Sequence, residues 1–289
     1  MKTALIAALI ALVVSYAHTS WLASPAATSY TPPDALSSYN RVMAARTLRC
    51  GYFTWPPYFS TDPVSGQHSG IYYDIINKLG QTLGLKVEWT MEYTLGQQVE
   101  ALRAGKVDAL CADGPWTRSA MPHLDYTTPY MFIPGYVFTL KGNPKFADPT
   151  DLARLNQPDV TFTALDGDGS AEYLDEYFPK AKRLTLPSTA DSSLIVQNVL
   201  TGKADAMFND TTTIAAQKPE DRARIQTMGS GKALATYPFL MSVSKGEIGL
   251  QNLLNQGLAV MQDGGMLEKI IRQHDPDGSL IGLPAPRYH

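Results

Sequence analysis

The residues best suited to chemistry lie in the segment DGPWTRSAMPHLDYTTPY, positions 113–130. A carboxylate at Asp113, an aromatic ring at Trp116 and a guanidinium at Arg118 stand close together there. A carboxylate attracts a cation, and an aromatic face can hold the same cation. Each residue also has a plainer interpretation, because Asp113 can cap a turn and Trp116 can pack in the core. The choice depends on where the segment lies in the fold.

Two segments that align without a gap indicate where these acids lie. GKVDALCAD (105–113) and GKADAMFND (202–210) each read as a helix ended by glycine, an apolar strand and a terminal acid. Asp113 and Asp210 therefore end equivalent strands. Ligands of open α/β sheets bind just outside the carboxyl ends of the strands. If two such lobes face each other, both aspartates point into one cleft.

Strand-like and helix-like segments alternate along the chain, which predicts an α/β fold with parallel βαβ units. The expected strands are LRCGYF (48–53), LKVEWT (85–90), KVDALCAD (106–113), VTFTALDGDG with its loop (160–169), AKRLTLP (181–187), KADAMFND (203–210) and YPFLMSVSKG (237–246). The expected helices are a short one ending near Ala45, 71–84 ended by Gly84, 95–105, 170–178 with Ser170 as N-cap, 192–202, and two within 249–274 broken at Gly264-Gly265.

Composition excludes several classes of function. The chain has 289 residues, is 44% hydrophobic and 18% charged, and carries a formal charge of −3. This is a folded globular protein without the basic surface that a nucleic-acid partner requires. The five histidines are scattered without metal-ligand spacing, and GSGKA (229–233) lacks the Ser or Thr that a phosphate loop needs. We therefore expect no metal, no cofactor and no catalytic acid–base pair.

The N-terminus has the features of a targeting segment. Lys2 precedes the apolar run 4–17, and small residues at Ser15 and Ala17 occupy the positions that a signal peptidase reads. We predict a signal peptide at 1–17, which places the mature chain in the periplasm or outside the cell. The alternative is an uncleaved membrane anchor, because Trp21 and Leu22 extend the apolar character. A linker and a short helix should fill 18–47.

The chain contains two cysteines, Cys50 and Cys111, each within an apolar strand-like segment. Export permits a disulfide. Sequence alone does not show that the pair meets the geometry that a disulfide requires, and cysteine packs well as a small hydrophobic residue. We therefore expect two buried free thiols.

From about Leu48 to about Ile271 the chain resembles the family 3 extracytoplasmic solute-binding proteins, the polar amino-acid receptors of ABC importers. The segments that carry the resemblance are LRCGYFTWPPYF (48–59), SGIYYDIINKLGQTLGLKVEW (69–89), GKVDALCADGPWT (105–117), LDYTTPY (124–130), DGSAEY (168–173) and GKADAMFND (202–210). The resemblance implies a two-lobed, type II periplasmic-binding fold that closes on its ligand by a hinge motion.

The family also implies a domain layout and partners. Lobe I would comprise 48–134 and 237–289, and lobe II 135–236, with crossing strands near 132–139 and 232–236. Such a receptor acts as a monomer, binds a small polar solute and presents it to a membrane permease.

The family's ligand-binding positions are only partly kept. Its Thr-x-x-Arg motif grips the ligand's α-carboxylate, and Thr117 matches the threonine, but Ala120 stands at the arginine position. Two further carboxylate-binding positions hold Pro115 and Ala171. The acid that grips an α-amino group is retained as Asp210.

The remaining site residues follow from the same comparison and from the rule that ligands bind at strand ends. Trp55 matches an aromatic residue that stacks on the ligand, although it can instead pack on proline at the rim. Tyr58 and Trp116 would add further aromatic faces. Arg118 can pair with Asp113, or it can reach a ligand carboxylate and so restore amino-acid binding. The expected contacts are Trp55, Tyr58, Asp113, Gly114, Trp116, Thr117, Arg118, Asp168, Ser170 and Asp210.

These residues predict a cleft for an amino acid or a related small cation, since Asp113 is an added acid opposite Asp210. Two other functions remain open. The same scaffold carries enzymes, such as the cyclohexadienyl dehydratases, and fold alone does not decide between them. A sensor domain anchored by an uncleaved N-terminus is the other.

Overall fold

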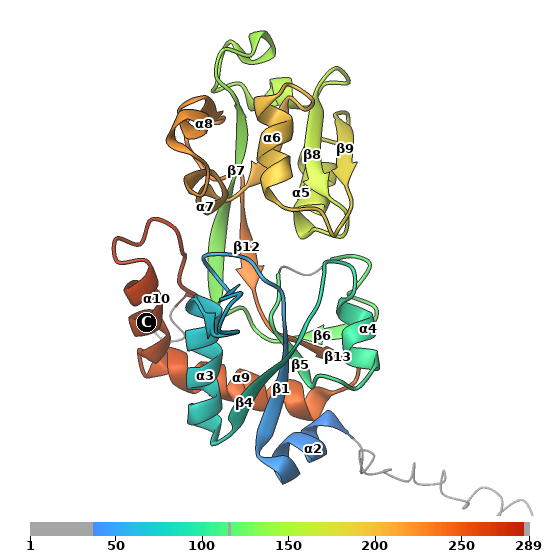
Figure 1. Ribbon diagram of the computed structural model, residues 1–289, viewed down its shortest axis with the longest axis vertical. Coiled ribbons are helices and arrows are strands. Elements are labelled where there is room, and N and C mark those ends of the chain that lie inside the picture. The colour runs from blue at the N-terminus through green and yellow to red at the C-terminus, as the bar shows by residue number, and fades with distance from the viewer. Residues whose placement is uncertain (1–36, 115–116, 286–289) are drawn as a thin grey trace, which may run out of the picture. The chain divides into compact units, whose positions relative to one another are not determined.

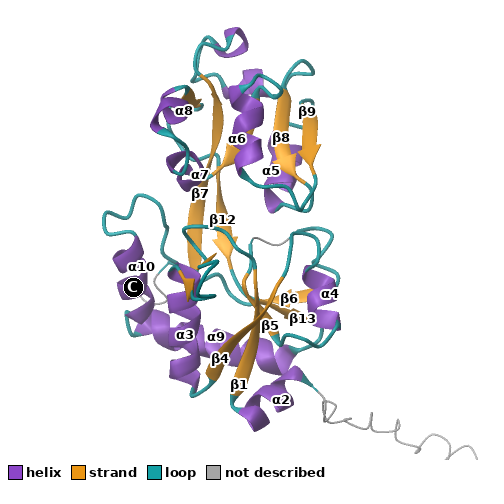
Figure 2. Cartoon of the chain, in the orientation of Figure 1, coloured by secondary structure: helices purple, strands orange, loops and turns teal. Residues whose placement is uncertain are grey.

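The computed structural model describes residues 37–114 and 117–285 (Figure 1). Helices and strands alternate through this part of the chain, so the predicted α/β class is confirmed (Figure 2). The predicted signal peptide at 1–17 and the tryptophan at Trp116 lie outside the described residues.

A five-stranded sheet forms the centre of the first lobe, in the order β4-β1-β5-β13-β6. β1 runs parallel to β4 and β5, whereas β13 runs antiparallel to β5 and β6. The elements of this lobe are α2 (Ser38–Ala45), β1 (Thr47–Tyr52), β2 (Ser60–Thr61), β3 (His68–Ser69), α3 (Ile71–Leu83), β4 (Lys86–Glu92), α4 (Gln98–Arg103), β5 (Ala109–Ala112), β6 (Leu124–Tyr126), β13 (Ser242–Ser244), α9 (Ile248–Asp263) and α10 (Met266–His274).

A six-stranded sheet forms the centre of the second lobe, in the order β11-β7-β10-β8-β9, with β12 also paired to β7. β8 runs parallel to β9 and β10, and β7 runs antiparallel to its neighbours. Its elements are β7 (Met131–Leu140), η1 (Pro144–Phe146), η2 (Leu152–Leu155), β8 (Thr161–Leu165), α5 (Gly169–Tyr177), β9 (Lys182–Leu186), α6 (Ser193–Leu200), β10 (Ala206–Asn209), α7 (Thr211–Ala215), α8 (Pro219–Ala223), β11 (Ile225–Thr227) and β12 (Ala235–Phe239).

The strands β7 and β12 run as a pair between the two sheets (Figure 1). Crossing strands were predicted at 132–139 and 232–236. The second strand begins later than predicted, at Ala235. Residues 229–231 form a turn in which all three φ angles are positive, and this conformation cannot continue a strand. The lobe limits at 134/135 and 236/237 stay a prediction.

The segment YPFLMSVSKG (237–246) is not the single strand that the sequence predicted. Its first part belongs to β12, which pairs with β7 in the second sheet. Its last part forms β13, which joins the first sheet between β5 and β6. The apolar character is continuous because both strands are buried, so periodicity alone could not reveal the change of sheet.

The two helices α3 and α9 pack closely on one face of the first sheet. The buried residues of α3 include Ile71, Ile75, Ile76 and Leu79, at helical spacing. A Cβ atom at Gly257 of α9 would lie 2.5 Å from Leu79, so the glycine allows the close approach. Gly84 adopts the left-handed conformation that ends α3, as predicted.

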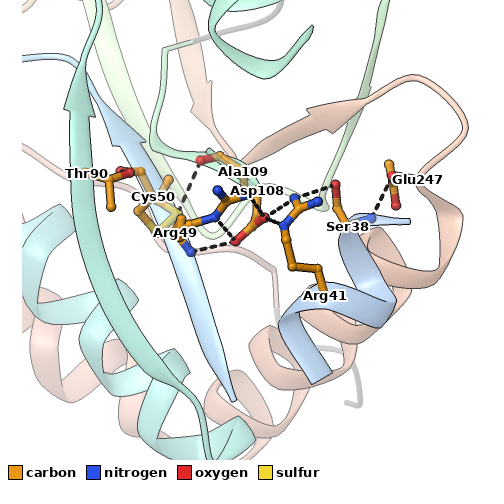
Figure 3. Close-up of polar contacts among 9 residues, drawn as sticks. Ser38, Arg41, Arg49, Cys50, Thr90, Asp108, Ala109 and Glu247 are labelled. Carbon is orange, nitrogen blue, oxygen red and sulfur yellow. Dashed lines mark hydrogen bonds and ion pairs between the residues drawn. A yellow bond between two sulfur atoms is a disulfide. The ribbon is translucent and has the colours of Figure 1, made fainter. Parts of the chain in front are cut away.

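The expectation of two free thiols is wrong, because Cys50 and Cys111 form a disulfide (Figure 3). Cys50 lies on β1 and Cys111 on the adjacent parallel strand β5. This pairing brings their Cα atoms to 5.3 Å, within the range that a disulfide spans. The sequence showed two strands but not that they are neighbours.

The repeated segments contain a second acid with a structural role. The N–H of Asp108 donates to the carbonyl of Arg49, and its carboxylate accepts the N–H of Arg49 at 2.8 Å. The guanidinium groups of Arg41 and Arg49 also bind this carboxylate, which ties α2 to the sheet (Figure 3). Asp108 is almost fully buried.

Asp205 repeats this arrangement in the second lobe. Its N–H donates to the carbonyl of Thr161 at 2.8 Å, and its carboxylate accepts the N–H of Thr161 at 2.9 Å. Lys145 supplies the cation, with its Nζ 2.8 Å from the carboxylate. The alignment of 105–113 with 202–210 therefore reflects equivalent structure in the two lobes.

Candidate functional site

A cavity of about 660 Å³ is lined by residues that follow β1, β5, β8 and β10. These are the carboxyl ends of strands from both sheets, where ligands of α/β folds bind. The predicted site residues that line it are Trp55, Asp113, Gly114, Thr117 and Asp168. Tyr58, Arg118, Ser170 and Asp210 are not among its described lining residues.

Asp113 is a buried acid at the wall of this cavity. Only 4% of its surface is exposed. Oδ1 accepts hydrogen bonds from the Tyr93 hydroxyl at 2.8 Å and from the Gly114 N–H at 2.9 Å, and Oδ2 accepts one from the Ser242 hydroxyl. Burial raises the pKa of Asp113 to about 6, although these hydrogen bonds oppose the rise. The carboxylate is therefore mostly ionised at neutral pH and largely desolvated.

Two other predicted acids cap helices of the second lobe. Asp168 is the N-cap of α5 and accepts the N–H of Ser170 at 3.0 Å. Ser170 was predicted as this N-cap, and that prediction is wrong, because the helix begins one residue earlier, at Gly169. Burial raises the pKa of Asp168. Asp210 is the N-cap of α7.

Trp55 and Tyr58 lie in the loop after β1. The Trp55 ring packs edge-on against Tyr58, with ring centroids 5.1 Å apart, and lies 5.5 Å from Phe239. Trp55 keeps part of its surface on the cavity. Tyr58 is 2% exposed, and its hydroxyl reaches Asp210. The loop therefore presents one aromatic ring to the cavity and buries the other.

Arg118 does not pair with Asp113. Its side chain is 64% exposed and forms ion pairs with Glu172 and Glu176 of α5. Its backbone N–H also donates to Glu172. Ala120, at the family's arginine position, packs in the apolar cluster of the first lobe. In the described structure, neither position offers a guanidinium to the cavity.

Several lining residues were not predicted. Asn209 directly precedes Asp210 at the end of β10, so the strand-end rule could have found it. Gln98 lies on α4 and Tyr237 on β12. Neither carried a sequence signal, because their positions depend on how these elements cross the site. Lys218 contributes a cation at the α7–α8 connection.

Residues 37–114 and 117–285 contain neither a metal site nor a membrane-spanning helix by the criteria of side-chain grouping, length and apolar character. No group of three or more His, Cys, Asp or Glu side chains is placed to hold a metal ion. None of the helices in these ranges is both long enough and apolar enough to cross a membrane.

Comparison with known proteins identifies relatives for nearly all of the described chain. The family described as bacterial extracellular solute-binding proteins, family 3, matches residues 48–275. The glutamine-binding protein of an ABC transporter from Bacillus subtilis is 22% identical over 73% of this chain and 74% of its own length. Membrane-bound lytic murein transglycosylase F from Idiomarina loihiensis is 24% identical over 65% of this chain, which spans only 40% of that enzyme.

Solved structures support the same assignment. An ancestral amino acid-binding protein, described as a precursor of cyclohexadienyl dehydratase, superposes with a TM-score of 0.66 at 26% identity. It covers 82% of this chain, and 98% of its own chain is matched. The two-lobed, type II periplasmic-binding fold is thereby confirmed. The chain belongs to the family 3 bacterial extracellular solute-binding proteins.

Proposed function

We propose that the protein is an extracytoplasmic receptor that captures a small cationic solute, an amino acid or a related amine, in this cavity. It acts as a monomer and delivers the solute to the membrane permease of an ABC importer. Family membership and the glutamine-binding relative support the receptor role. The carboxylates that line the cavity support a positive charge on the solute.

The charge of the cavity wall is the observation that carries this proposal. Its described carboxylates are Asp113, Asp168, Asp191 and Asp221, and its one described basic side chain is Lys218. A desolvated carboxylate such as Asp113 gains most from a cationic partner, because electrostatic attraction is stronger where water is excluded. The Trp55 ring adds an aromatic face suited to a cation.

The same wall is poorly suited to an α-carboxylate. Ala120 supplies no charge, and Arg118 is held by the two glutamates of α5. The N-terminus of α5, where backbone N–H groups otherwise attract anions, is capped by Asp168. We therefore favour a solute whose affinity comes mainly from its cationic group. Arg118→Ala should weaken binding strongly only if the solute's carboxylate recruits this arginine.

A thermal-shift screen of amino acids, amines and polyamines tests the proposal. A ligand at a hundred times its Kd stabilises the folded state by about 2.7 kcal/mol, which raises the Tm by roughly 5–10 °C for a chain of this size. Cationic compounds should give the shift, and Asp113→Asn should reduce it. A shift produced only by anions without a cationic group would contradict the proposal.

An enzymatic function is the second candidate, and Asp113 is the observation that favours it. A buried carboxyl group with a pKa of about 6 beside a cavity can serve as a general acid or base. The ancestral binding protein described as a precursor of cyclohexadienyl dehydratase has the same fold. Incubation with prephenate and arogenate separates the two functions, because a receptor leaves both compounds unchanged.

A further inference from the structure

The carboxylate of Asp210 is already enclosed by hydrogen-bond donors. Oδ1 accepts the backbone N–H groups of Thr212 at 2.7 Å and Thr213 at 3.3 Å, and also the Thr212 hydroxyl. The Thr213 hydroxyl lies 3.4 Å from Oδ2 and 3.1 Å from Oδ1 of Asn209, so these two oxygens share its proton. Asp210 is 1% exposed. Its side chain therefore serves mainly its own helix, α7.

The remaining donor to Asp210 comes from the other lobe. The hydroxyl of Tyr58, in the loop after β1, donates to Asp210 Oδ1 at 3.4 Å and lies 3.5 Å from the Thr212 hydroxyl. The Tyr58 hydroxyl therefore covers Asp210 on the side that faces the first lobe.

Tyr58 is held firmly in that position. Its carbonyl accepts the N–H of Tyr72 at 3.1 Å. A Cβ atom at Gly70, which has a φ of 113°, would lie 2.4 Å from the same carbonyl oxygen, so glycine is required for this close packing. The Tyr58 ring also packs against Trp55 and Phe239. Burial raises the pKa of the Tyr58 hydroxyl far above neutrality, so it remains a donor.

Asp113 differs from Asp210 in its access to solute. Its oxygens accept three hydrogen bonds from hydroxyl and amide groups, whereas a carboxylate offers about four acceptor sites. Asp113 lines the cavity and Asp210 is not among the described lining residues. An incoming cation therefore finds Asp113 with acceptor capacity to spare.

We propose that Tyr58 is a specificity-determining residue whose hydroxyl takes the place of a ligand ammonium at Asp210, so that Asp113 receives the cation of the solute. This inference rests on the proposed function and adds the chemical class of the solute. The preferred solute is an amine or guanidinium compound that binds through one cationic group at Asp113. An α-amino group contributes little, because its usual acceptor is occupied.

Binding measurements with defined probes test the inference. The probes are L-arginine, agmatine (arginine without its carboxylate) and n-pentylamine, which carries a single ammonium group, each measured by calorimetry. Asp113→Asn should weaken the tightest probe by about tenfold or more, and Asp210→Asn by less than about threefold. Both substitutions remove the charge while nearly keeping the side-chain shape, and asparagine is as good an N-cap as aspartate. A loss for Asp210→Asn equal to that for Asp113→Asn overturns the inference.

The Tyr58→Phe variant tests directly whether the Tyr58 hydroxyl occupies Asp210. In this background Asp210 lacks its partner from the first lobe, so L-arginine should gain affinity relative to n-pentylamine, which has no second cationic group, and Asp210→Asn should abolish the gain. Tyr130→Phe is the matched control. Its hydroxyl donates to the Cys111 carbonyl at 3.3 Å within the first lobe, so the preference among probes should not change. An unchanged preference in Tyr58→Phe counts against the inference.

A second measurement needs no ligand. Tyr58→Phe should lower the Tm by about 3–12 °C in the parent protein, the scale of one hydrogen bond to a charged group. It should have a smaller effect in Asp210→Ser, where serine keeps the helix cap but is too short to meet the hydroxyl, and only the Thr212 contact remains. Equal effects in both backgrounds would mean that Tyr58 does not occupy Asp210. A parent that binds none of the probes contradicts the proposed function, while this thermal comparison still decides the inference.

Discussion

The raised pKa of Asp113 predicts that replacing this acid stabilises the unliganded protein, and that the gain depends on pH. In Asp113→Asn the buried position keeps its shape and loses its ionisable proton. Around it lie the hydroxyls of Tyr93 and Ser242 and the amide of Gly114. None of these groups changes charge between pH 4 and pH 7, so the pH dependence belongs to Asp113 itself.

The magnitude follows from the two pKa values. The pKa is about 6 in the folded protein and 3.8 for an ordinary aspartate. Between these values the folded protein holds a proton that the unfolded chain has released, so stability falls as pH rises. Each pH unit costs about 1.4 kcal/mol, and the whole interval costs about 3 kcal/mol. Below the lower value the cost disappears, and above the upper value it is constant.

Urea denaturation of the parent and of Asp113→Asn at several values from pH 4 to pH 7.5 measures this effect. The stability difference in favour of the variant should grow by about 3 kcal/mol across the range. Asp62→Asn is the control with the opposite sign. Hydrogen bonds from Ser65 and Val64 lower the pKa of Asp62, so its replacement should cost stability at the higher pH values.

A stability difference that stays flat with pH would refute the reasoning, since it would mean that Asp113 titrates as an ordinary acid. A bound cation should remove the dependence, because it stabilises the ionised carboxylate. For the same reason, affinity for a cationic solute should fall as pH drops below about 6, by up to tenfold per unit. This loss should be absent in Asp113→Asn.

Three further predictions concern other parts of the structure. Trp55→Ala should weaken solute binding by about 1–3 kcal/mol by calorimetry with the fold intact, and equal affinity would assign Trp55 a purely structural role. Replacing Cys50 and Cys111 together by alanine should lower the free energy of unfolding by about 2–4 kcal/mol, because the bridge closes a loop between residues 61 positions apart; an unchanged urea midpoint would contradict this. Asp108→Ala should cost about 2–3 kcal/mol, less than for a fully buried ion pair because its arginine partners keep part of their surface in water. A loss below 1 kcal/mol would show that Asp108 does not hold α2 in place.

Most of the fold could be predicted from local patterns. Helix α3 has apolar residues at helical spacing and ends at Gly84, and α9 and α10 are separated at Gly264-Gly265 as expected. The errors arose where the answer depended on neighbours in space. The Cys50–Cys111 bridge required knowing that β1 and β5 are adjacent, and the division of 237–246 required knowing that two sheets share it.

At the candidate site, too, local patterns could not show which residues are neighbours in space. The strand-end rule needs only the position of a strand, and Asp113, which follows β5, lines a cavity. It also placed Asp210 at a strand end, but it could not show that Tyr58 reaches this acid from the other lobe. From the sequence, Arg118 was expected to pair with Asp113 or to reach a ligand carboxylate, because its partners Glu172 and Glu176 lie far along the chain.

The equivalent acids Asp108 and Asp205 affect how the two lobes can move. Asp108 binds the backbone of β1 and Asp205 that of β8, and each has its cationic partner in its own lobe. A hinge motion would leave all these bonds intact. The contacts that would separate are those between lobes, such as Arg118 with Glu172.

Each lobe can therefore move as a rigid body, with the bending confined to β7 and β12. Amide hydrogen exchange would distinguish the rigid lobes from the strands that bend. Bound ligand should leave the protection of the backbone amides of Arg49 and Thr161 unchanged, because both lie inside their lobes. It should alter the protection of amides along β7 and β12 and at the surfaces where the two lobes meet.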